Sequence, residues 1–454
     1  MKIFKTINSP IIFPIIFFIL IILVGSILLH ISGKSKIESL SWTDSVFSAT
    51  SAACVTGLVV VDTGSYFTAF GKTIILCLMQ VGGLGIMTFT SLSIYLWRRR
   101  TTITDRIAVG QILLHDTRFN LGKFLVEIVS WTFIIEAVGA VLLYLIAPKA
   151  FSPFSAIFHS VSAFCNAGFS LFAKSLIAWK GNWGINLVFI FLIFIGGLGF
   201  SVFVEFKNFI IKRVRLRPTQ NRKGISWYAK MVFQTSFFLI ILGWIAIYLA
   251  EFVGYKRMML PDNAILSALF QSVTSRTAGF NTLDIAQMTN VSLVILLFLM
   301  FIGGAPGSCA GGIKVTTFRV LAAAIWSQLK GKKQTVIGKF AISEEAVKKA
   351  MVLFVLAVII IFLAVFLLDF TEGGDKPHYQ VRGQFLEILF DSVSAFSTVG
   401  LSTGLTSTLS TAGKWIIIFL MLIGRLGPFV LISALQSVQE TQYYSLPEEN
   451  VMIG

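Results

Sequence analysis

Four short stretches decide the fold of this chain: Cys54-Val55-Thr56-Gly57, Cys165-Asn166-Ala167-Gly168, Arg276-Thr277-Ala278-Gly279 and Ser397-Thr398-Val399-Gly400. Each ends in a single glycine, follows a run rich in Ser, Thr and Ala that a phenylalanine opens, and precedes a long apolar segment. The four glycines lie 111, 111 and 121 residues apart. An internal repeat at matching positions indicates four similar units, which we expect to form a ring around one axis.

The composition places these units in a membrane. The 454 residues are 56% hydrophobic and 13% charged, with 43 phenylalanines and a mean hydropathy of +0.84, which is far from a soluble domain. Residues 10–31 form an apolar stretch behind Lys2 and Lys5. This stretch is longer than the core of a signal peptide and lacks a small-residue cleavage pattern, so we expect a retained transmembrane helix.

The net charge of +16 comes from basic residues that gather in a few segments. Of the 37 Lys and Arg residues, 22 fall in residues 1–9, 98–123, 205–230 and 330–349, and these segments alternate with the four motifs. The positive-inside rule then predicts a multi-pass protein of the cell membrane with its N- and C-termini in the cytoplasm. Anionic lipids and an acidic face of a cytosolic partner are the expected companions of this charge, and nucleic acid is not.

Each motif belongs to a predicted unit of helix, re-entrant segment and helix. The segment from Phe47 to Gly57 is too short to cross hydrocarbon, so it must enter and return on one side. Outer helices are expected at about 10–31, 124–147, 231–252 and 350–369. Second helices are expected at about 71–97, 185–213 and 414–437, and as two half-helices around 303–314 in the third unit. The fold class is all-α integral membrane, with four tandem helix–pore loop–helix repeats around a pseudo-fourfold pore axis: residues 1–97, 98–213, 214–328 and 329–454.

Polar residues mark the starts of the re-entrant half-helices. Thr43 or Asp44 is expected to cap the first one, because a side-chain oxygen satisfies free N–H groups at a helix start. Ser152 and Pro153 are expected as the cap and first-turn residues of the second.

The non-helical ends of the four segments predict a path for a cation. In hydrocarbon, irregular backbone is tolerated only where protein or water satisfies its polar groups. Four such strands around one axis would turn carbonyl oxygens inward, where they can replace the hydration shell of a bare cation, and glycine allows the dihedral angles that this needs. The alternative is that each glycine only marks a turn between two helices. The expected filter has three residues from each motif: Val55, Thr56, Gly57, Asn166, Ala167, Gly168, Thr277, Ala278, Gly279, Thr398, Val399 and Gly400.

A second set of small residues recurs in the second helices, at Gly82-Gly83, Gly196-Gly197, Gly303-Gly304 and Gly424-Arg425. An arginine at membrane depth is costly unless it faces water or a partner, so we expect Arg425 to face the pathway and oppose a passing cation. The alternative is that it joins two helices through carbonyl groups. The break at 303–314 has more glycine than a kink requires and lacks the Gly-Lys-Ser/Thr of a nucleotide-binding loop. The expected gate consists of Gly303, Gly304, Pro306, Gly307, Gly311, Gly312, Lys314 and Arg425.

Two other charged residues at membrane depth, Arg276 and Glu136, each have two possible roles. Arg276 is expected to brace the third motif from behind with an acidic partner, or else to point outward at the mouth. Phe270 lies nine residues before Gly279 where the other three intervals are ten, so the third wall should differ locally. Glu136 is expected to brace two helices, with a functional role as the alternative. The four cysteines lack C-x-x-C spacing and a paired His, so neither a metal site nor a disulfide framework is expected.

On the four single-glycine motifs and the glycine-rich break at 303–314, the chain resembles the membrane subunit of the Ktr/Trk/HKT superfamily of potassium transporters, most closely the KtrB type. The resemblance covers essentially the whole chain. It implies a selective K⁺ path along the pseudo-fourfold axis, a homodimer with one pore per subunit and a cytosolic nucleotide-binding regulatory ring. No nucleotide is expected on this chain itself, and coupling to Na⁺, as in a symporter, stays open.

These observations predict the ion-translocating membrane subunit of a K⁺ uptake system rather than an enzyme. An intramembrane enzyme would need paired carboxylates or a Ser/His or His/Cys set at depth, and the four histidines are scattered among the segments. The alternative is an alternating-access secondary transporter of another solute. Such a carrier usually has two halves with broken helices in corresponding positions, whereas this sequence indicates four quarters and one broken helix.

Overall fold

The computed structural model describes residues 12–32, 40–85, 121–215, 224–253, 263–373, 377 and 379–427. This part of the chain is almost entirely helical, and its only strands are β1 (Val336–Ile337) and β2 (Phe340–Ala341), which pair antiparallel. The predicted all-α class is confirmed. Residues 86–97 and 428–437 of two predicted second helices lie outside the described residues, as does most of the basic stretch 98–123.

The four outer helices are long and apolar enough to cross a membrane, as predicted. They are α2 (Ile12–Ser32), α8 (Leu121–Ile146), α12 (Trp227–Tyr248), which a short π-helix η2 (Leu249–Val253) continues, and α16 (Glu344–Glu372). Between 28% and 39% of each span is buried inside the protein. Large apolar side chains such as Leu145 and Phe366, both 68% exposed, cover the rest. A surface of this kind is stable in lipid and not in water.

A short half-helix follows each outer helix and ends at one of the four motifs. These half-helices are α3 (Trp42–Ala53), α9 (Pro153–Phe164), α13 (Ala264–Thr274) and α17 (Gln384–Phe396). The longest has 13 residues, and at a rise of 1.5 Å per residue it spans about 20 Å, less than the ~30 Å of a hydrocarbon core. The half-helices are therefore re-entrant, as their lengths predicted.

The caps of these half-helices agree with the sequence in one case and differ in another. Ser152 caps α9 and Pro153 opens its first turn, as predicted. In α3 the prediction was wrong, because the cap is Ser41, whose hydroxyl accepts from the Asp44 amide at 3.1 Å. Asp44 lies in the first turn instead, and its carboxylate forms an ion pair of 2.7 Å with Lys414. The side chain thus joins two repeats, and its other oxygen accepts from the hydroxyl of the cap residue Ser41 at 2.7 Å.

The second helices are interrupted more often than the sequence indicated. They begin as α5 (Ala69–Gly83), α10 (Trp183–Gly197), α14 (Asn290–Phe301) and α18 (Thr411–Leu426), and α14 continues as α15 (Val315–Leu329) after the predicted loop. The prediction of one continuous helix at 185–213 was wrong. After α10 the chain turns by 109° into α11 (Phe200–Arg215). Gly199 makes the turn with φ +85°, and the Phe200 amide donates to the Gly307 carbonyl of the third repeat at 3.0 Å.

Short turns connect each motif to its second helix. They are α4 (Thr63–Tyr66), η1 (Ile177–Trp179), η3 (Ile285–Gln287) and η4 (Leu405–Thr408). Asp62 caps α4 and accepts from the amides of Gly64 and Ser65, and Asp284 caps η3 and accepts from the Ala286 amide. These turns bring the chain back from the motif to the start of the next membrane helix.

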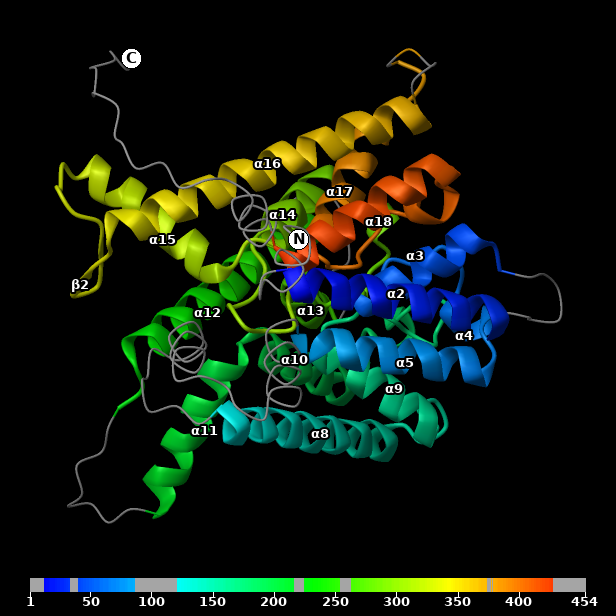
Figure 1. The fold of residues 1–454 in the computed structure, drawn as a ribbon, viewed down its shortest axis with the longest axis horizontal. Coiled ribbons are helices and arrows are strands. Elements are labelled where there is room, and N and C mark those ends of the chain that lie inside the picture. Colours follow the sequence, from blue (N-terminus) through cyan, green and yellow to red (C-terminus); the bar gives the residue numbers. More distant parts are fainter. Residues whose placement is uncertain are drawn as a thin grey trace, which may run out of the picture.

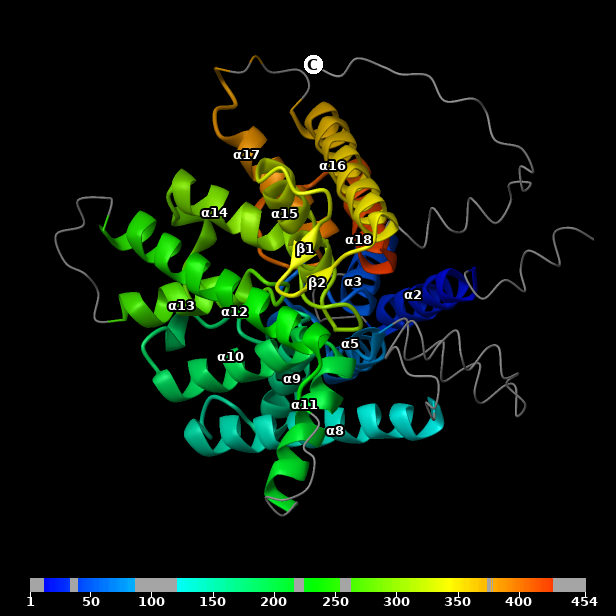
Figure 2. The same cartoon turned by 90° about the vertical axis from the view of Figure 1, so that its left-hand side faces the viewer.

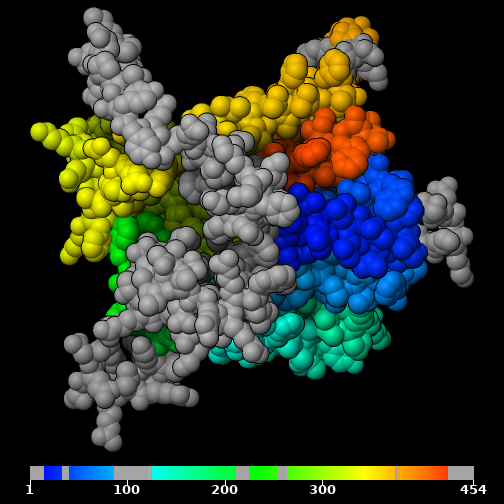
Figure 3. Space-filling model, in the orientation of Figure 1, coloured from blue at the N-terminus to red at the C-terminus, as the bar shows by residue number. Residues whose placement is uncertain are grey.

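The four repeats follow one another around a common centre. Figure 2 shows the helices of the first repeat (α2, α3, α5), the second (α8 to α10), the third (α12 to α14) and the fourth (α16 to α18) in this order around the molecule, and Figure 1 shows the same groups from the side. The packing is cyclic, since α5 contacts α9, α10 contacts α13, α14 contacts α17 and α18 contacts α3. In the space-filling view the first two repeats lie next to each other in blue and cyan (Figure 3). The predicted pseudo-fourfold arrangement is confirmed.

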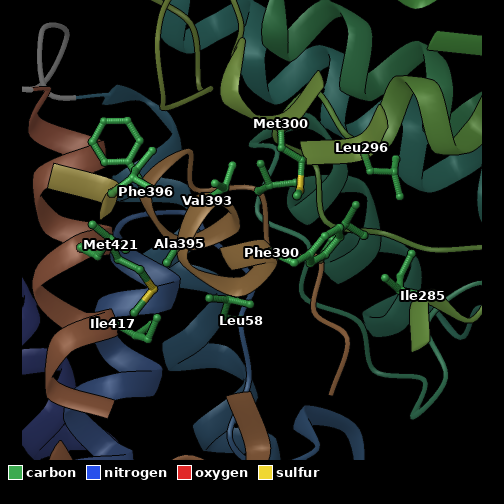
Figure 4. Packing of buried hydrophobic residues seen from close by; sticks show 14 of the residues in the cluster. Leu58, Ile285, Leu296, Met300, Phe390, Val393, Ala395, Phe396, Ile417 and Met421 are labelled. Atoms are coloured by element: carbon green, nitrogen blue, oxygen red, sulfur yellow. The ribbon is translucent and has the colours of Figure 1, made fainter. Parts of the chain in front are cut away.

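The apolar core joins neighbouring repeats rather than filling each one separately. The phenylalanines that open the four motif runs, Phe47, Phe158, Phe270 and Phe390, are all fully buried. One cluster combines residues of the first, third and fourth repeats, and Figure 4 shows Phe390 of α17 beside Met300 of α14. Because buried side chains of one repeat pack against those of another, the core holds the four motifs at fixed positions around the centre.

Candidate ion pathway

The four motif glycines form a closed ring, called the glycine ring below. A Cβ built on Gly57 would collide with the Ala167 carbonyl oxygen, and one on Gly168 would approach the Ala278 oxygen to 3.0 Å. In the same order, a Cβ on Gly279 would meet the Val399 oxygen, and one on Gly400 the Thr56 oxygen. Each glycine thus faces the backbone of the following repeat, and the fourth faces the first. Only a residue without a side chain fits at each of the four positions.

The backbone of each motif alternates between left-handed and ordinary dihedral angles. The residue two before each glycine has a positive φ: 51° at Val55, 56° at Asn166, 73° at Thr277 and 50° at Thr398. The glycines themselves have φ between 70° and 90°. A left-handed conformation in a residue with a side chain is uncommon and costs of order 1–3 kcal/mol. Four such residues at matching positions make the backbone of the motifs the candidate functional site.

The amide groups of the motifs hydrogen bond back into their own half-helices. The Thr56 amide donates to the Ser51 carbonyl at 2.8 Å, Ala167 to Ser162 at 2.7 Å, and Val399 to the Ser394 carbonyl. Within the described residues, the carbonyl oxygens of Thr56, Ala167, Ala278 and Val399 accept no hydrogen bond. Oxygens that are unpaired and gathered around one axis are suitable ligands for a dehydrated cation.

A hydroxyl group supports each motif from behind. Ser51 donates to the Leu58 carbonyl at 2.7 Å, and Ser162 donates to the Phe169 carbonyl at 2.8 Å. Thr274 does the same for Phe280 at 2.6 Å, and the Gly400 amide donates to Ser394 Oγ at 3.1 Å. These hydroxyls fix the strands and do not bond to the carbonyl groups of Thr56, Ala167, Ala278 and Val399.

The third wall is one residue shorter, as the spacing of Phe270 predicted. Its supporting hydroxyl, on Thr274, lies five residues before Gly279, whereas the serines lie six residues before their glycines. The Ala278 amide bonds to the Thr274 carbonyl at 2.9 Å, four residues back, where the other motifs reach five residues back. The missing residue is therefore absorbed at the end of α13, before the chain reaches the glycine ring.

The residue after each buried phenylalanine differs between repeats, and two of these residues were missed by the sequence analysis. The Asp391 carboxylate, fully buried, accepts from Ser402 Oγ at 2.8 Å, Thr406 Oγ1 at 2.6 Å and the amides of Thr403 and Thr406. In the second repeat His159 Nε2 accepts from the Leu171 amide at 3.2 Å. Both side chains hold the strand that leaves the glycine ring. An acid directly after the opening phenylalanine was the available signal for Asp391.

The side chain of Arg276 lies behind the third motif, as predicted. The prediction of an acidic partner was wrong. The side chain is only 7% exposed, so it does not point outward at the mouth. Its guanidinium donates to the Ser236 carbonyl at 3.0 Å and to the Gly303 carbonyl at 2.9 Å. Carbonyl oxygens with free lone pairs satisfy an arginine without a second charge. Arg276 thus ties the third motif to α12 and to the start of the 303–314 loop.

The positions Gly82-Gly83, Gly196-Gly197, Gly303-Gly304 and Gly424-Arg425 are called the second-helix junctions below. At three of them the first glycine supports the end of its own half-helix. A Cβ on Gly82, Gly196 or Gly424 would collide with the carbonyl oxygen of Ala53, Phe164 or Phe396, respectively. At Gly303 the obstructing atom is instead the Gly311 oxygen, which belongs to the loop. The third junction is therefore built from the loop itself.

The predicted gate residues come together at these junctions. The loop from 302 to 314 is fixed by backbone hydrogen bonds: the Ala305 amide donates to Gly197 at 3.0 Å, and Cys309 donates to Gly196 at 3.2 Å. Arg425, 8% exposed, donates to the carbonyls of Cys309 in the loop and Gly82 in α5. These carbonyl contacts are the ones expected of the bracing alternative, and they join Arg425 directly to the loop. Lys314 Nζ closes the loop on the Ala310 carbonyl at 2.6 Å.

Glu136 connects the outer helix α8 to α5 and α9, as the bracing interpretation predicted. Its carboxylate accepts from Gln80 Nε2 of α5 at 3.1 and 3.2 Å, and its carbonyl accepts from Ser160 Oγ at 2.6 Å. It also accepts from the thiol of Cys165, the first residue of the second motif, at 3.7 Å. This contact links a buried carboxylate to the motif, which its position in the sequence did not indicate.

Comparison with known proteins gives the family. The TrkH family, described as cation transport protein, matches residues 8–441. The chain is 36% identical to Ktr system potassium uptake protein B of Bacillus subtilis, over 96% of this chain and 95% of that protein. It is 34% identical to potassium/sodium uptake protein NtpJ of Enterococcus hirae, over 96% and 95% of the two chains. The crystal structure of the potassium transporter TrkH from Vibrio parahaemolyticus has the same fold, with a TM-score of 0.71, 23% identity and coverage of 92% of this chain and 84% of that one.

These relatives are transporters and not enzymes, in agreement with the sequence prediction. Together with the four outer helices and the closed glycine ring, the family match over residues 8–441 identifies a multi-pass membrane protein that belongs to the TrkH family of cation transport proteins.

Proposed function

We propose that this chain is the ion-translocating membrane subunit of a K⁺ uptake system. The observation that carries the proposal is the glycine ring, in which four backbone strands with unpaired carbonyl oxygens meet around one axis. The cation sheds water and is bound by the carbonyls of the four motifs. K⁺ is the proposed ion because the relatives at 34–36% identity are named for potassium uptake, and the name of NtpJ, which adds sodium, keeps Na⁺ as a second ion.

The 303–314 loop and Arg425 form the proposed gate. Support comes from the contacts of the Arg425 guanidinium, which holds the loop carbonyl of Cys309 and the α5 carbonyl of Gly82 at once. A cation that passes this positive charge is repelled by roughly 4 kcal/mol at about 4 Å and an effective dielectric of about 20. Release of the loop from Gly196 and Gly197 opens the path.

The proposal includes the assembly that the family resemblance implies. The chain forms a homodimer with one pore per subunit and binds a cytosolic nucleotide-binding ring. The N- and C-termini lie in the cytoplasm of a cell-membrane protein, where the basic segments contact anionic lipids. Support comes from the alternation of basic segments with the four motifs along the chain.

An alternating-access carrier of another solute remains the rival. The turn between α10 and α11 gives the structure a second interrupted helix, so the argument from a single broken helix no longer holds. The closed ring is the stronger argument for a pore, because a carrier for an organic solute needs a cavity at the midplane, whereas these four glycines bring backbones into contact.

The experiment is rescue of a K⁺-uptake-deficient bacterium at low K⁺. The unmodified chain should restore growth and Rb⁺ uptake. Gly57→Ser, Gly168→Ser, Gly279→Ser and Gly400→Ser should each abolish rescue or admit Na⁺, because each new Cβ meets a carbonyl oxygen of the next repeat.

Gly224→Ser is the matched control, since nothing lies within 4 Å of a Cβ there and the φ angle is ordinary. It should rescue as well as the unmodified chain at equal membrane expression. Rescue and ion selectivity that survived all four ring substitutions would refute the pore.

A further inference from the structure

Two thiols from different repeats meet at the junction of the first repeat. Cys309 in the loop directs its Sγ at the Gly83 carbonyl oxygen, 3.0 Å away. Gly83 also faces Cys165 of the second motif, because a Cβ built on Gly83 would collide with that sulfur atom. Both sulfur atoms therefore lie against one residue. The sequence analysis did not anticipate this pair.

A carboxylate lies beside one of the two thiols. Both cysteines are free and buried, with exposures of 0% for Cys165 and 1% for Cys309. Cys165 Sγ donates to Glu136 Oε1 at 3.7 Å, and Gln80 Nε2 holds this oxygen in place at 3.2 Å. The thiolate is the form that attacks in disulfide formation. Glu136 is thus positioned to accept the proton of Cys165.

We propose that Cys165 and Cys309 are an oxidisable pair, and that a disulfide between them fixes the loop to the second motif and stops cation flux. The oxidant is a peroxide. Hydrogen peroxide oxidises Cys309 to a sulfenic acid and releases one water. Cys165 then attacks that sulfur while Glu136 takes its proton as general base. The S–O bond breaks, the S–S bond forms, and the hydroxyl leaves with the Glu136 proton as the second water.

The consequence for flux rests on the proposed gating role of the loop. Ala305 and Cys309 hold the loop to the α10 junction through backbone hydrogen bonds. Bonds of this kind can break and re-form. A covalent bond between residues 165 and 309 does not. It joins the loop of the third repeat to the wall of the second and holds the loop at the position seen here. Reduction of the disulfide releases it.

The test uses the purified full chain in liposomes that take up Rb⁺. After hydrogen peroxide, proteolysis and mass spectrometry should show a peptide that links Cys165 to Cys309, and Rb⁺ uptake should be largely lost. Dithiothreitol should restore uptake and remove the linked peptide. Cys165→Ser and Cys309→Ser should each keep their uptake in peroxide. Serine is a suitable replacement at 165, because Ser397 occupies the same position in the fourth motif.

Two other cysteines serve as matched controls. Cys54 holds the corresponding position of the first motif and is buried, and Cys77 is exposed on α5. Cys54→Ser and Cys77→Ser should remain as sensitive to peroxide as the unmodified chain, and Glu136→Gln should form the linked peptide more slowly. No linked peptide, or a linked peptide with unchanged Rb⁺ uptake, would overturn the proposal. The proposed function itself fails separately, if the untreated protein carries no Rb⁺.

Discussion

The glycine ring and the second-helix junctions are parts of the same four repeats, but the ring is alike in its four quarters and the junctions are not. Every quarter of the ring places a glycine against the carbonyl of the next repeat. At the junctions, the second residue is Gly83, Gly197, Gly304 or Arg425, and the third repeat inserts a loop. On the proposed pathway, a cation at the centre meets all four walls at once, so these must match. The proposed gate needs only one side that moves, and there the repeats differ.

The largest effect is expected where a junction glycine touches a half-helix. Gly196→Ala puts a methyl group into the Phe164 carbonyl oxygen, which the helix end cannot move away. Overpacking against backbone should cost about 3 kcal/mol or more. Folded protein, measured by size-exclusion chromatography after heating, should be largely lost. Gly197→Ala is the control, since its nearest neighbour is 3.5 Å away. Equal stability of the two variants would contradict close packing at the junction.

Asp391 tests whether the support behind the ring is as necessary as the ring. Asp391→Asn replaces a carboxylate oxygen by an NH₂ group, which cannot accept from Thr403 or Thr406. One buried donor left unpaired costs about 1–3 kcal/mol. We expect a lower melting temperature and weaker discrimination of K⁺ from Na⁺ in flux measurements. The exposed cap Asp284→Asn should change neither. If Asp391→Asn kept full selectivity, the carboxylate would be separate from the ring.

Substitution of the two buried arginines, Arg425 and Arg276, distinguishes a gating role from a bracing role. Arg425→Ala removes the tie between the loop and α5, and Rb⁺ uptake should rise about tenfold, which corresponds to about 1.4 kcal/mol. Arg276→Ala is the matched substitution, because Arg276 also donates to two carbonyl groups. It should lower the yield of folded protein without raising uptake per molecule. Unchanged uptake by Arg425→Ala at equal expression would leave Arg425 as a second brace.

The smallest effect is expected from the hydroxyls behind the ring. Ser162→Ala removes one hydrogen bond, to the Phe169 carbonyl. The loss should be about 1 kcal/mol of stability, with a small change in ion selectivity. Ser407→Ala, at an exposed serine that bonds to Gly404 outside the ring, is the control and should be neutral. A large loss of selectivity from Ser162→Ala would show that the hydroxyls tune the ring rather than only hold it.

The repeat, the half-helices and the ring could be predicted from the sequence because each leaves a local sign. The single glycines recur at matching intervals, the half-helices are too short to cross, and the apolar outer helices are long. The shorter third wall was visible in the spacing of Phe270. Each of these signs can be read within a single repeat, although the contacts that close the glycine ring join different repeats.

What could not be predicted depends on partners far away in the chain. The turn after α10 occurs inside an apolar run, and the contact that fixes it comes from Gly307 of another repeat. Arg276 donates to carbonyl groups instead of an acid, and Asp44 forms an ion pair with Lys414 of the fourth repeat instead of capping α3. The spacing of Cys165 and Cys309 in the sequence does not predict that they lie close together in the structure. Such contacts are decided by tertiary packing, which overrides local preference.

The closure of the ring between Gly400 and Thr56 also bears on how the protein is made. The first repeat leaves the ribosome long before its last neighbour exists, and Arg425 meets the Gly82 carbonyl 343 residues earlier in the chain. At a synthesis rate of about 5–20 residues per second, that separation is about 20–70 s. During this interval the first half-helix lacks the wall that covers it. A nascent chain that stops after three repeats therefore leaves uncovered the faces of α3 and α14 that the fourth repeat covers in the complete protein.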